Sequence, residues 1–354
     1  MRLLRTAHAW AGAVLCILLA VLALSGTLLV LKADYLRLTF PEARQPLDLS
    51  PQRLGATISV IEAQLAGEGI SYVSVADQNA SLHKVVFKDG GGAYVSQDGA
   101  VVDRWTKNGR VEEWLFDLHH YLLAGNTGKL IAGVAAVAAV LLIISGLVIV
   151  WPALRVFAWR VWPQSGKRQH LLANHRDLGV IFAAPLLVLT VTGASLVFSE
   201  QARALMAFLP TDNGQFVAVG EAQDGDVNWP RVFEVAKTQF PDAVPRIVSW
   251  PRADRKSASL RVRREAEWHQ NGRTYLYFNP ATDALVGAQD ALKLDTRERV
   301  FNTFYPLHSA GVGGRLYDLV SFASGLVLAA LGCIGCWTFL TKKRRRKAVP
   351  QHAL

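Results

Sequence analysis

The sequence predicts an α-helical membrane bundle of four transmembrane helices, built as a two-fold internal repeat, with two α+β domains outside the membrane. Three observations predict it: four long apolar stretches without a charge, an uneven distribution of basic residues, and histidines and glycines that recur at fixed offsets. The stretches are 9–31, 130–151, 178–199 and 319–341. Of the 354 residues, 51% are hydrophobic and 19% are charged. This pattern excludes a soluble enzyme, a secreted domain and a disordered chain.

Each apolar stretch is long enough to cross a bilayer, because about 22 residues form a helix of roughly 33 Å. Arg2 and Arg5 precede the first stretch, as in a signal peptide. Its apolar run is too long for one, and no clear cleavage site follows, so we expect it to remain as a helix. The predicted transmembrane helices are 9–31, 129–151, 178–199 and 317–341.

The basic residues predict the orientation in the membrane. The segments 1–8, 153–177 and 342–347 carry a net charge of +12, whereas the long connections 33–127 and 199–316 carry −3. The positive-inside rule therefore places both termini and the middle loop in the cytoplasm and predicts a bacterial inner-membrane protein with two large periplasmic loops. The remaining segments are a cytoplasmic N-terminus at 1–8, outer domains at 32–128 and 200–316, a cytoplasmic loop at 152–177 and a tail at 342–354.

The basic tail and the cysteines each have two interpretations. A run of Lys and Arg can bind nucleic acid, but after an apolar helix it is better explained as a stop-transfer signal and anchor to lipid headgroups. Cys333 and Cys336 form a CxxC motif inside a predicted helix. Close helix packing explains it better than redox chemistry. We therefore expect the lipid bilayer, and no nucleic acid, as a partner.

Four histidines and four glycines recur at fixed offsets, 167 residues between the first and third helices and 189 between the second and fourth. Internal similarity of this kind indicates a duplicated unit of helix, outer domain and helix. The equivalent pairs are His8 and His175, Gly26 and Gly193, His119 and His308, and Gly146 and Gly335.

The repeat predicts one pair of facing histidines at each membrane surface. Two units packed about a pseudo-two-fold axis bring His8 to His175 on the inner side and His119 to His308 on the outer side. Facing imidazoles suit haem iron, which takes an axial nitrogen from each side. Zinc fits less well, because no cysteine or carboxylate pattern completes four-coordination.

The glycines support haem, since each falls at the level of a histidine pair and a flat macrocycle needs small residues beside it. Close helix packing is the alternative for the glycines, and headgroup anchoring is the alternative for the histidines. Two further histidines complicate the choice of ligands. His120 adjoins His119, although the repeat selects His119, and His170 could be a second-shell or propionate partner.

The outer segments each predict a helix followed by alternating strands and hairpin turns, typical of small α+β units. Neither shows the pattern of a serine hydrolase or a metalloprotease. The predicted helices are 50–65 and 229–239, and the predicted strands are 71–75, 83–87, 93–95, 101–105, 246–249, 257–263, 274–278 and 284–286.

The motifs His8-Ala-Trp-Ala-Gly12 and His175-Arg-Asp-Leu-Gly179, with Leu118-His119 and Leu307-His308, resemble the PepSY-associated transmembrane helix family over nearly the whole chain. Members of that family include iron-regulated inner-membrane proteins and di-haem ferrisiderophore reductases. The resemblance implies PepSY-like outer domains, two b-type haems on the inner and outer histidine pairs, and periplasmic reduction of ferric siderophores. Two departures are an alanine after His8, where arginine is common, and Ile334 before Gly335, where serine or threonine is common.

The predicted function is therefore a haem-dependent ferric-chelate reductase that releases Fe(II) for uptake. The middle loop of about 25 residues is too short for a nucleotide-binding domain, so a quinol or a separate flavoprotein must supply the electron. The alternative is a non-enzymatic PepSY protein that binds or inhibits a periplasmic partner. A transporter ranks last, because the centres of the helices hold few polar residues. Arg261, Arg263 and Arg264 could contact substrate, although a solvated strand face is the default.

Overall fold

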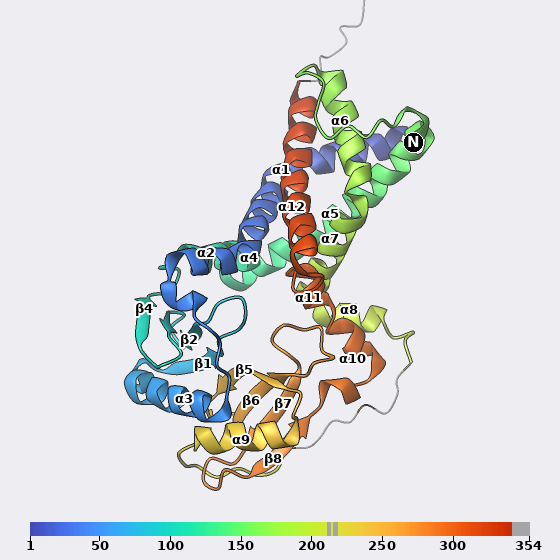
Figure 1. The fold of residues 1–354 in the computed structure, drawn as a ribbon. Helices are drawn as coiled ribbons and strands as arrows, with labels where there is room; N and C mark the ends of the chain where they lie inside the picture. The colour runs from blue at the N-terminus through green and yellow to red at the C-terminus, as the bar shows by residue number, and fades with distance from the viewer. Residues whose placement is uncertain (211–213, 215–218, 342–354) are drawn as a thin grey trace, which may run out of the picture.

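The computed structural model describes residues 1–210, 214 and 219–341; the predicted basic tail and His352 lie outside the described residues. The molecule has a helical bundle at one end and a layered α/β domain at the other (Figure 1). Within the described residues, three helices are long and apolar enough to span a membrane, and a bent pair gives a fourth candidate. The protein is therefore a multi-pass membrane protein with a separate antiparallel sheet domain.

The bundle contains α1 (Arg2–Val30), α5 (Gly125–Val150), α6 (Arg168–Ile181), α7 (Ala183–Val197) and α12 (Gly314–Leu340). In this bundle α1 packs along α12, and α5 packs along α7. Many apolar side chains on these helices are exposed, such as Ile17, Leu141 and Leu319, as expected for surfaces that contact lipid tails. Small side chains allow the close approach, since a Cβ added at Gly325 of α12 would lie 1.9 Å from Thr27 Oγ1 of α1.

The third predicted span, 178–199, differs from a single straight helix. The structure divides this region at Phe182 into α6 and α7, which are bent by 68°. Pro185 explains the break, because it has no N–H for the carbonyl of Ile181 and its ring clashes with that carbonyl. His175 therefore lies in the middle of α6 rather than at the start of a span.

Short helices join the bundle to the outer domain. Glu113 of α4 forms ion pairs with Lys32, where α2 begins, and with Lys84 of the sheet, so α4 is held against both parts. A Cβ at Gly128 would lie 1.6 Å from the Tyr121 carbonyl, so only glycine permits this turn between α4 and α5. The short helices are α2 (Lys32–Thr39), α4 (Val111–Tyr121), α8 (Ser199–Leu205), α10 (Thr296–Phe301) and α11 (Phe304–His308), with 3-10 turns η1 (Pro41–Arg44), η2 (Ala66–Glu68), η3 (Trp151–Val156) and η4 (Ala291–Lys293).

The two predicted outer domains share one antiparallel sheet of eight strands, in the order β4-β3-β2-β1-β5-β6-β7-β8. Its centre is the pairing of β1 with β5, where Val73 faces Val248. The prediction of two separate domains therefore needs correction, because the first strand of each half leaves an edge that the other half covers. The strands are β1 (Ile70–Ser74), β2 (His83–Phe87), β3 (Gly92–Val95), β4 (Val101–Trp105), β5 (Val244–Ser249), β6 (Ala258–Arg263), β7 (Thr274–Phe278) and β8 (Leu285–Gln289).

One face of the sheet carries α3 (Pro51–Leu65) and α9 (Trp229–Gln239) side by side (Figure 1). Both helices begin with a proline in the first turn, where its missing N–H costs nothing, and the Asn228 side chain caps α9. Gly55 lets the helices touch, since a Cβ there would lie 2.4 Å from Pro230 Cα. A single apolar core extends under both helices and across both halves of the sheet. Neither half buries this core alone.

Candidate functional site

His119 and His308 face each other where the bundle meets the outer domain. They come from the two short helices α4 and α11, which pack against α1 and α7 respectively. Their ring centroids are 6.0 Å apart and the ring planes are inclined by 29°. We call this pair the outer site.

Each outer imidazole is held through its Nδ1 atom by the neighbouring long helix. Nδ1 of His119 lies 2.9 Å from the Leu22 carbonyl and 3.2 Å from Ser25 Oγ. Nδ1 of His308 lies 2.9 Å from the Leu189 carbonyl and 3.5 Å from Thr192 Oγ1. Because a carbonyl can only accept, Nδ1 must carry the proton, which leaves Nε2 as the nitrogen that can bind a metal.

The two positions beside the outer site have room only for glycine, because the histidine rings lie against the helix backbone. A Cβ at Gly26 would lie 2.7 Å from Cε1 of His119, and a Cβ at Gly193 would lie 2.7 Å from Cε1 of His308. Such a contact is shorter than any that carbon atoms tolerate, so a larger residue would push the ring away from its partner. Each predicted glycine therefore makes room for one imidazole.

His8 and His175 face each other at the opposite end of the bundle. His8 lies in the second turn of α1, and His175 lies in α6. Their ring centroids are 6.4 Å apart and the ring planes are nearly perpendicular, at 85°. Nδ1 of His8 lies 2.9 Å from Ser145 Oγ of α5. We call this pair the inner site.

Glycines also face the inner site, but less closely. A Cβ at Gly146 would lie 3.4 Å from Cε1 of His8, and a Cβ at Gly335 would lie 3.6 Å from Cε1 of His175. These are close to ordinary van der Waals contacts. All four predicted glycines therefore contact the predicted histidines, with a tighter fit at the outer site than at the inner one.

The spacing of the imidazoles fits a shared iron. With metal–nitrogen bonds of about 2 Å and a ring radius of about 1 Å, two axial imidazoles would place their centroids roughly 6 Å apart. No cluster of three or more histidine, cysteine or acidic side chains within the described residues could hold a metal ion. Two imidazoles alone leave a metal coordinatively incomplete, whereas a porphyrin brings four nitrogens of its own. The residues present therefore fit haem better than a bare ion.

Two further properties suit a ligand role. Burial lowers the pKa of His119 to about 3 and also lowers the pKa of His308, so both outer imidazoles stay neutral, as a metal ligand must be.

His8 and Gly26 are eighteen residues apart on the continuous helix α1. At 1.5 Å per residue this separates the inner and outer sites by roughly 27 Å, close to the thickness of a bilayer core.

A family model of the PepSY-associated TM region matches residues 5–342. The chain belongs to this family. No curated protein matches the sequence. The four histidines that the resemblance selected are thus part of a PepSY-associated TM chain, and the matched region contains both sites.

The two other predicted histidines of this PepSY-associated chain make local contacts. His120 stacks on Phe116, and its Nδ1 lies 2.9 Å from the Phe116 carbonyl. Nδ1 of His170 lies 2.7 Å from Ser165 Oγ, five residues away. The structure therefore pairs His119, not His120, with His308, while the second-shell or propionate role of His170 stays a prediction.

The arginines considered for substrate contact are engaged within the outer domain. Arg261 donates to the Gly272 carbonyl, Arg263 donates to the Glu267 carbonyl, and Arg264 pairs with Asp242. These contacts hold the turn between β6 and β7 and tie it to the turn before β5. They favour a structural role for the three arginines.

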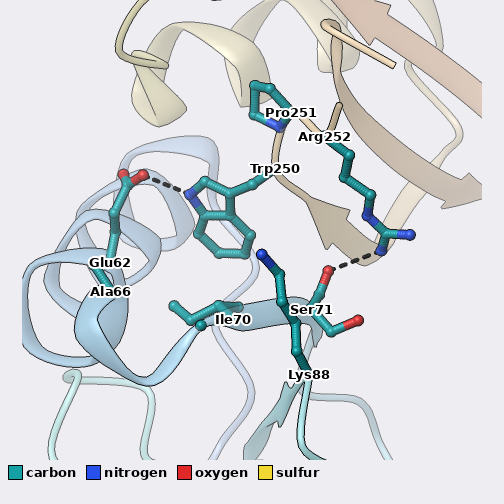
Figure 2. Close-up of a pocket in the computed structure, with 9 residues that line it drawn as sticks. Glu62, Ala66, Ile70, Ser71, Lys88, Trp250, Pro251 and Arg252 are labelled. Atoms are coloured by element: carbon teal, nitrogen blue, oxygen red, sulfur yellow. Dashed lines mark hydrogen bonds between the residues drawn. The ribbon is translucent and has the colours of Figure 1, made fainter. Parts of the chain in front are cut away.

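A small pocket of about 170 Å³ lies on the α3 side of the sheet, away from both sites. Figure 2 shows Trp250 reaching from the end of β5 toward Glu62 of α3, with Lys88 and Arg252 beside it. Glu62 accepts hydrogen bonds from the indole nitrogens of both Trp250 and Trp229. The pocket is thus part of the seam between the two halves of the sheet.

The hydroxyls that contact the imidazoles are the functional residues that sequence reasoning did not assign. Ser25, Ser145 and Thr192 each precede a predicted glycine. Their position before these glycines could have predicted them, because a residue next to a glycine that faces a ring lies near the same ring.

Proposed function

We propose that this protein is an inner-membrane di-haem electron-transfer protein that reduces ferric iron in periplasmic siderophore complexes. The observation that carries the proposal is the pair of facing imidazoles at each end of the bundle, each backed by a glycine. His8 and His175 would hold the inner b-type haem, and His119 and His308 the outer one. Each haem would supply reversible one-electron transfer.

The arrangement of the helices supports a two-fold repeat as the origin of both sites. α1 pairs with α12 as α7 pairs with α5, and α4 lies on α1 as α11 lies on α7. The pairing of β1 with β5 at the middle of the sheet fits the same axis. We infer that each of the two duplicated units supplies one histidine to each site.

The orientation follows from charge. We infer that the inner site and both termini face the cytoplasm, because His8 and His175 lie in the basic segments 1–8 and 153–177. We infer that the sheet domain lies in the periplasm. Glu113 and its two lysine partners couple the sheet to α4, which carries His119. The chain thus holds its outer site directly against the domain that would meet a periplasmic substrate.

The substrate would be Fe(III) held by a siderophore. One electron converts it to Fe(II), which binds the hard oxygen donors of a siderophore far more weakly, and the chelator is released unchanged. A quinol or a separate flavoprotein would supply that electron at the inner side. The side chains of this chain act by binding, orienting and shielding the redox groups rather than by acid–base chemistry.

The test begins with the purified full-length protein from haem-sufficient cells. We expect two haems per chain by the pyridine haemochrome assay and b-type absorption bands. Protein reduced with dithionite and freed of excess reductant should then be reoxidised by ferric siderophores, with Fe(II) trapped by ferrozine.

Each result has a defined meaning. A colourless protein would overturn the proposal and favour the non-enzymatic alternative, in which the sheet domain binds a partner. A di-haem protein that no ferric siderophore reoxidises would keep the electron-transfer role and reject the substrate. Apo-protein with free haem added to the assay controls for reduction by loosely bound haem.

A further inference from the structure

The four ligand histidines contact four similar pieces of helix. Three of these pieces read Leu-x-x-Ser/Thr-Gly, at residues 22–26, 142–146 and 189–193. In each, the glycine faces the imidazole and the preceding hydroxyl lies beside it. The fourth piece, 331–335, has the leucine and the glycine but carries Ile334 in place of the hydroxyl.

The three hydroxyls share one hydrogen-bond pattern. Ser25 donates to the Val21 carbonyl, Ser145 to the Leu142 carbonyl and Thr192 to the Val188 carbonyl. Because each hydroxyl proton is used within its own helix, each oxygen is left to accept from the Nδ1–H of an imidazole. This fixes the ring orientation and the tautomer that exposes Nε2.

His175 lacks this support. Its Nδ1 is buried and makes no hydrogen bond of normal geometry within the described residues. The Leu331 carbonyl acts on the ring as a hydrogen-bond acceptor, but outside normal hydrogen-bond geometry, and Ile334 offers only methyl and methylene groups. Among the described residues His175 thus has one carbonyl near its Nδ1 and no hydroxyl, whereas each outer histidine has a carbonyl at 2.9 Å and a hydroxyl.

We propose that Ile334 is a redox-tuning residue of the inner site, because it withholds from His175 the hydroxyl that the other three histidines receive. The inference rests on the haem proposal above. A hydrogen bond from Nδ1–H makes an imidazole a more basic ligand, and a more basic axial ligand stabilises Fe(III) over Fe(II). Without that bond His175 is the weakest electron donor of the four, and the inner haem accepts an electron more readily.

The test uses an isosteric pair of variants in the full-length holoprotein. Ile334→Thr restores the Thr-Gly pattern of Thr192 and Gly193, whereas Ile334→Val has the same shape without the hydroxyl. We expect the Thr variant to lower the midpoint potential of the inner haem relative to the Val variant and the wild type, and to leave the outer haem unchanged. The inner haem is identified as the one lost in His8→Ala.

A second measurement separates electronic tuning from altered packing. The low-spin ferric EPR signal of the inner haem should shift in the Thr variant and stay in place in the Val variant, with equal haem content in both. Equal potentials in the Thr and Val variants, or a shift of the outer haem alone, would overturn the role of Ile334 and leave the di-haem proposal intact. A wild-type protein without haem would reject both.

Discussion

The inner and outer sites hold the same pair of side chains in different ways. The outer histidines come from two short helices, and each Nδ1 contacts both a backbone carbonyl and a hydroxyl of the adjacent long helix. The inner histidines come from α1 and α6 themselves, with one hydroxyl partner for His8 and none for His175. The outer rings lie at 29° to each other and the inner rings at 85°.

This difference shows two ways of holding an imidazole in place. At the outer site, backbone carbonyls and tight glycine contacts fix each ring independently of any single side chain. At the inner site, the ring positions depend on one hydroxyl and on looser packing. We therefore expect the outer site to tolerate loss of a hydroxyl but not added volume, and the inner site to show the reverse.

The largest effect should come from removing a ligand. His119→Ala or His308→Ala should eliminate the outer haem and leave one haem per chain, because one imidazole of each pair is then missing. His8→Ala or His175→Ala should eliminate the inner one. Haem quantitation together with EPR measures both losses, since near-parallel and perpendicular ring planes give different low-spin signals.

His120→Ala is the matched control, because this ring adjoins His119 but stacks on Phe116. Haem content should stay at two per chain. Loss of the outer haem in this variant alone would mean that the ligand of α4 has been assigned to the wrong histidine.

Low pH should destabilise the sheet domain. Burial lowers the pKa of His83, the first residue of β2, to about 4. Between pH 6.5 and 4 the unfolded chain binds a proton that the native sheet excludes, so stability falls as the pH falls. His83 should lower the free energy of unfolding of the domain by about 3 kcal/mol over this range.

Thermal or denaturant unfolding followed by tryptophan fluorescence checks this acid sensitivity. His83→Asn removes the titration but keeps an acceptor for the Ala76 N–H. The variant should lose the part of this pH dependence that His83 contributes, while a comparable part remains because burial also lowers the pKa of His269, to about 2. An unchanged slope would assign the acid sensitivity to another group.

Glycine substitutions should distinguish the packing of the two sites. Gly26→Ala and Gly193→Ala place a Cβ 2.7 Å from a ring, and overpacking of this kind costs about 1–3 kcal/mol, or roughly 5- to 150-fold in haem affinity. Gly146→Ala and Gly335→Ala should change affinity only a few-fold. Haem transfer to apo-myoglobin measures all four.

All four substitutions give the helix the same gain in propensity, so they serve as controls for one another. Equal changes in haem affinity at the inner and outer glycines would show that the glycines allow close helix packing in general and do not make room for the rings.

Loss of a single hydroxyl should affect the inner site more than the outer one. Ser145→Ala leaves Nδ1 of His8 without its described partner and should weaken inner haem binding by about tenfold or more. Ser25→Ala leaves the Leu22 carbonyl as acceptor for His119 and should change outer binding much less. Titration of apo-protein with haemin compares them, and a larger loss in Ser25→Ala would contradict the proposed difference between the sites.

Much of the site was accessible from sequence because a duplication leaves its mark in spacing. The offsets of 167 and 189 residues selected the four histidines and four glycines, and each glycine contacts a selected histidine. The strands of the outer region were also predicted, since alternation of apolar residues is a local signal. The family assignment followed from the same motifs.

The sequence by itself determined the membrane class, the candidate ligands and the local elements, because apolar length, spacing and periodicity are properties of neighbouring residues. Only the tertiary structure decided that the two outer units form one sheet, that Pro185 divides the third span, and that Ser25, Ser145 and Thr192 support their rings while Ile334 does not. These features depend on contacts between residues that are far apart in the chain. A hydrogen bond or a shared strand edge exists only once both partners are in place.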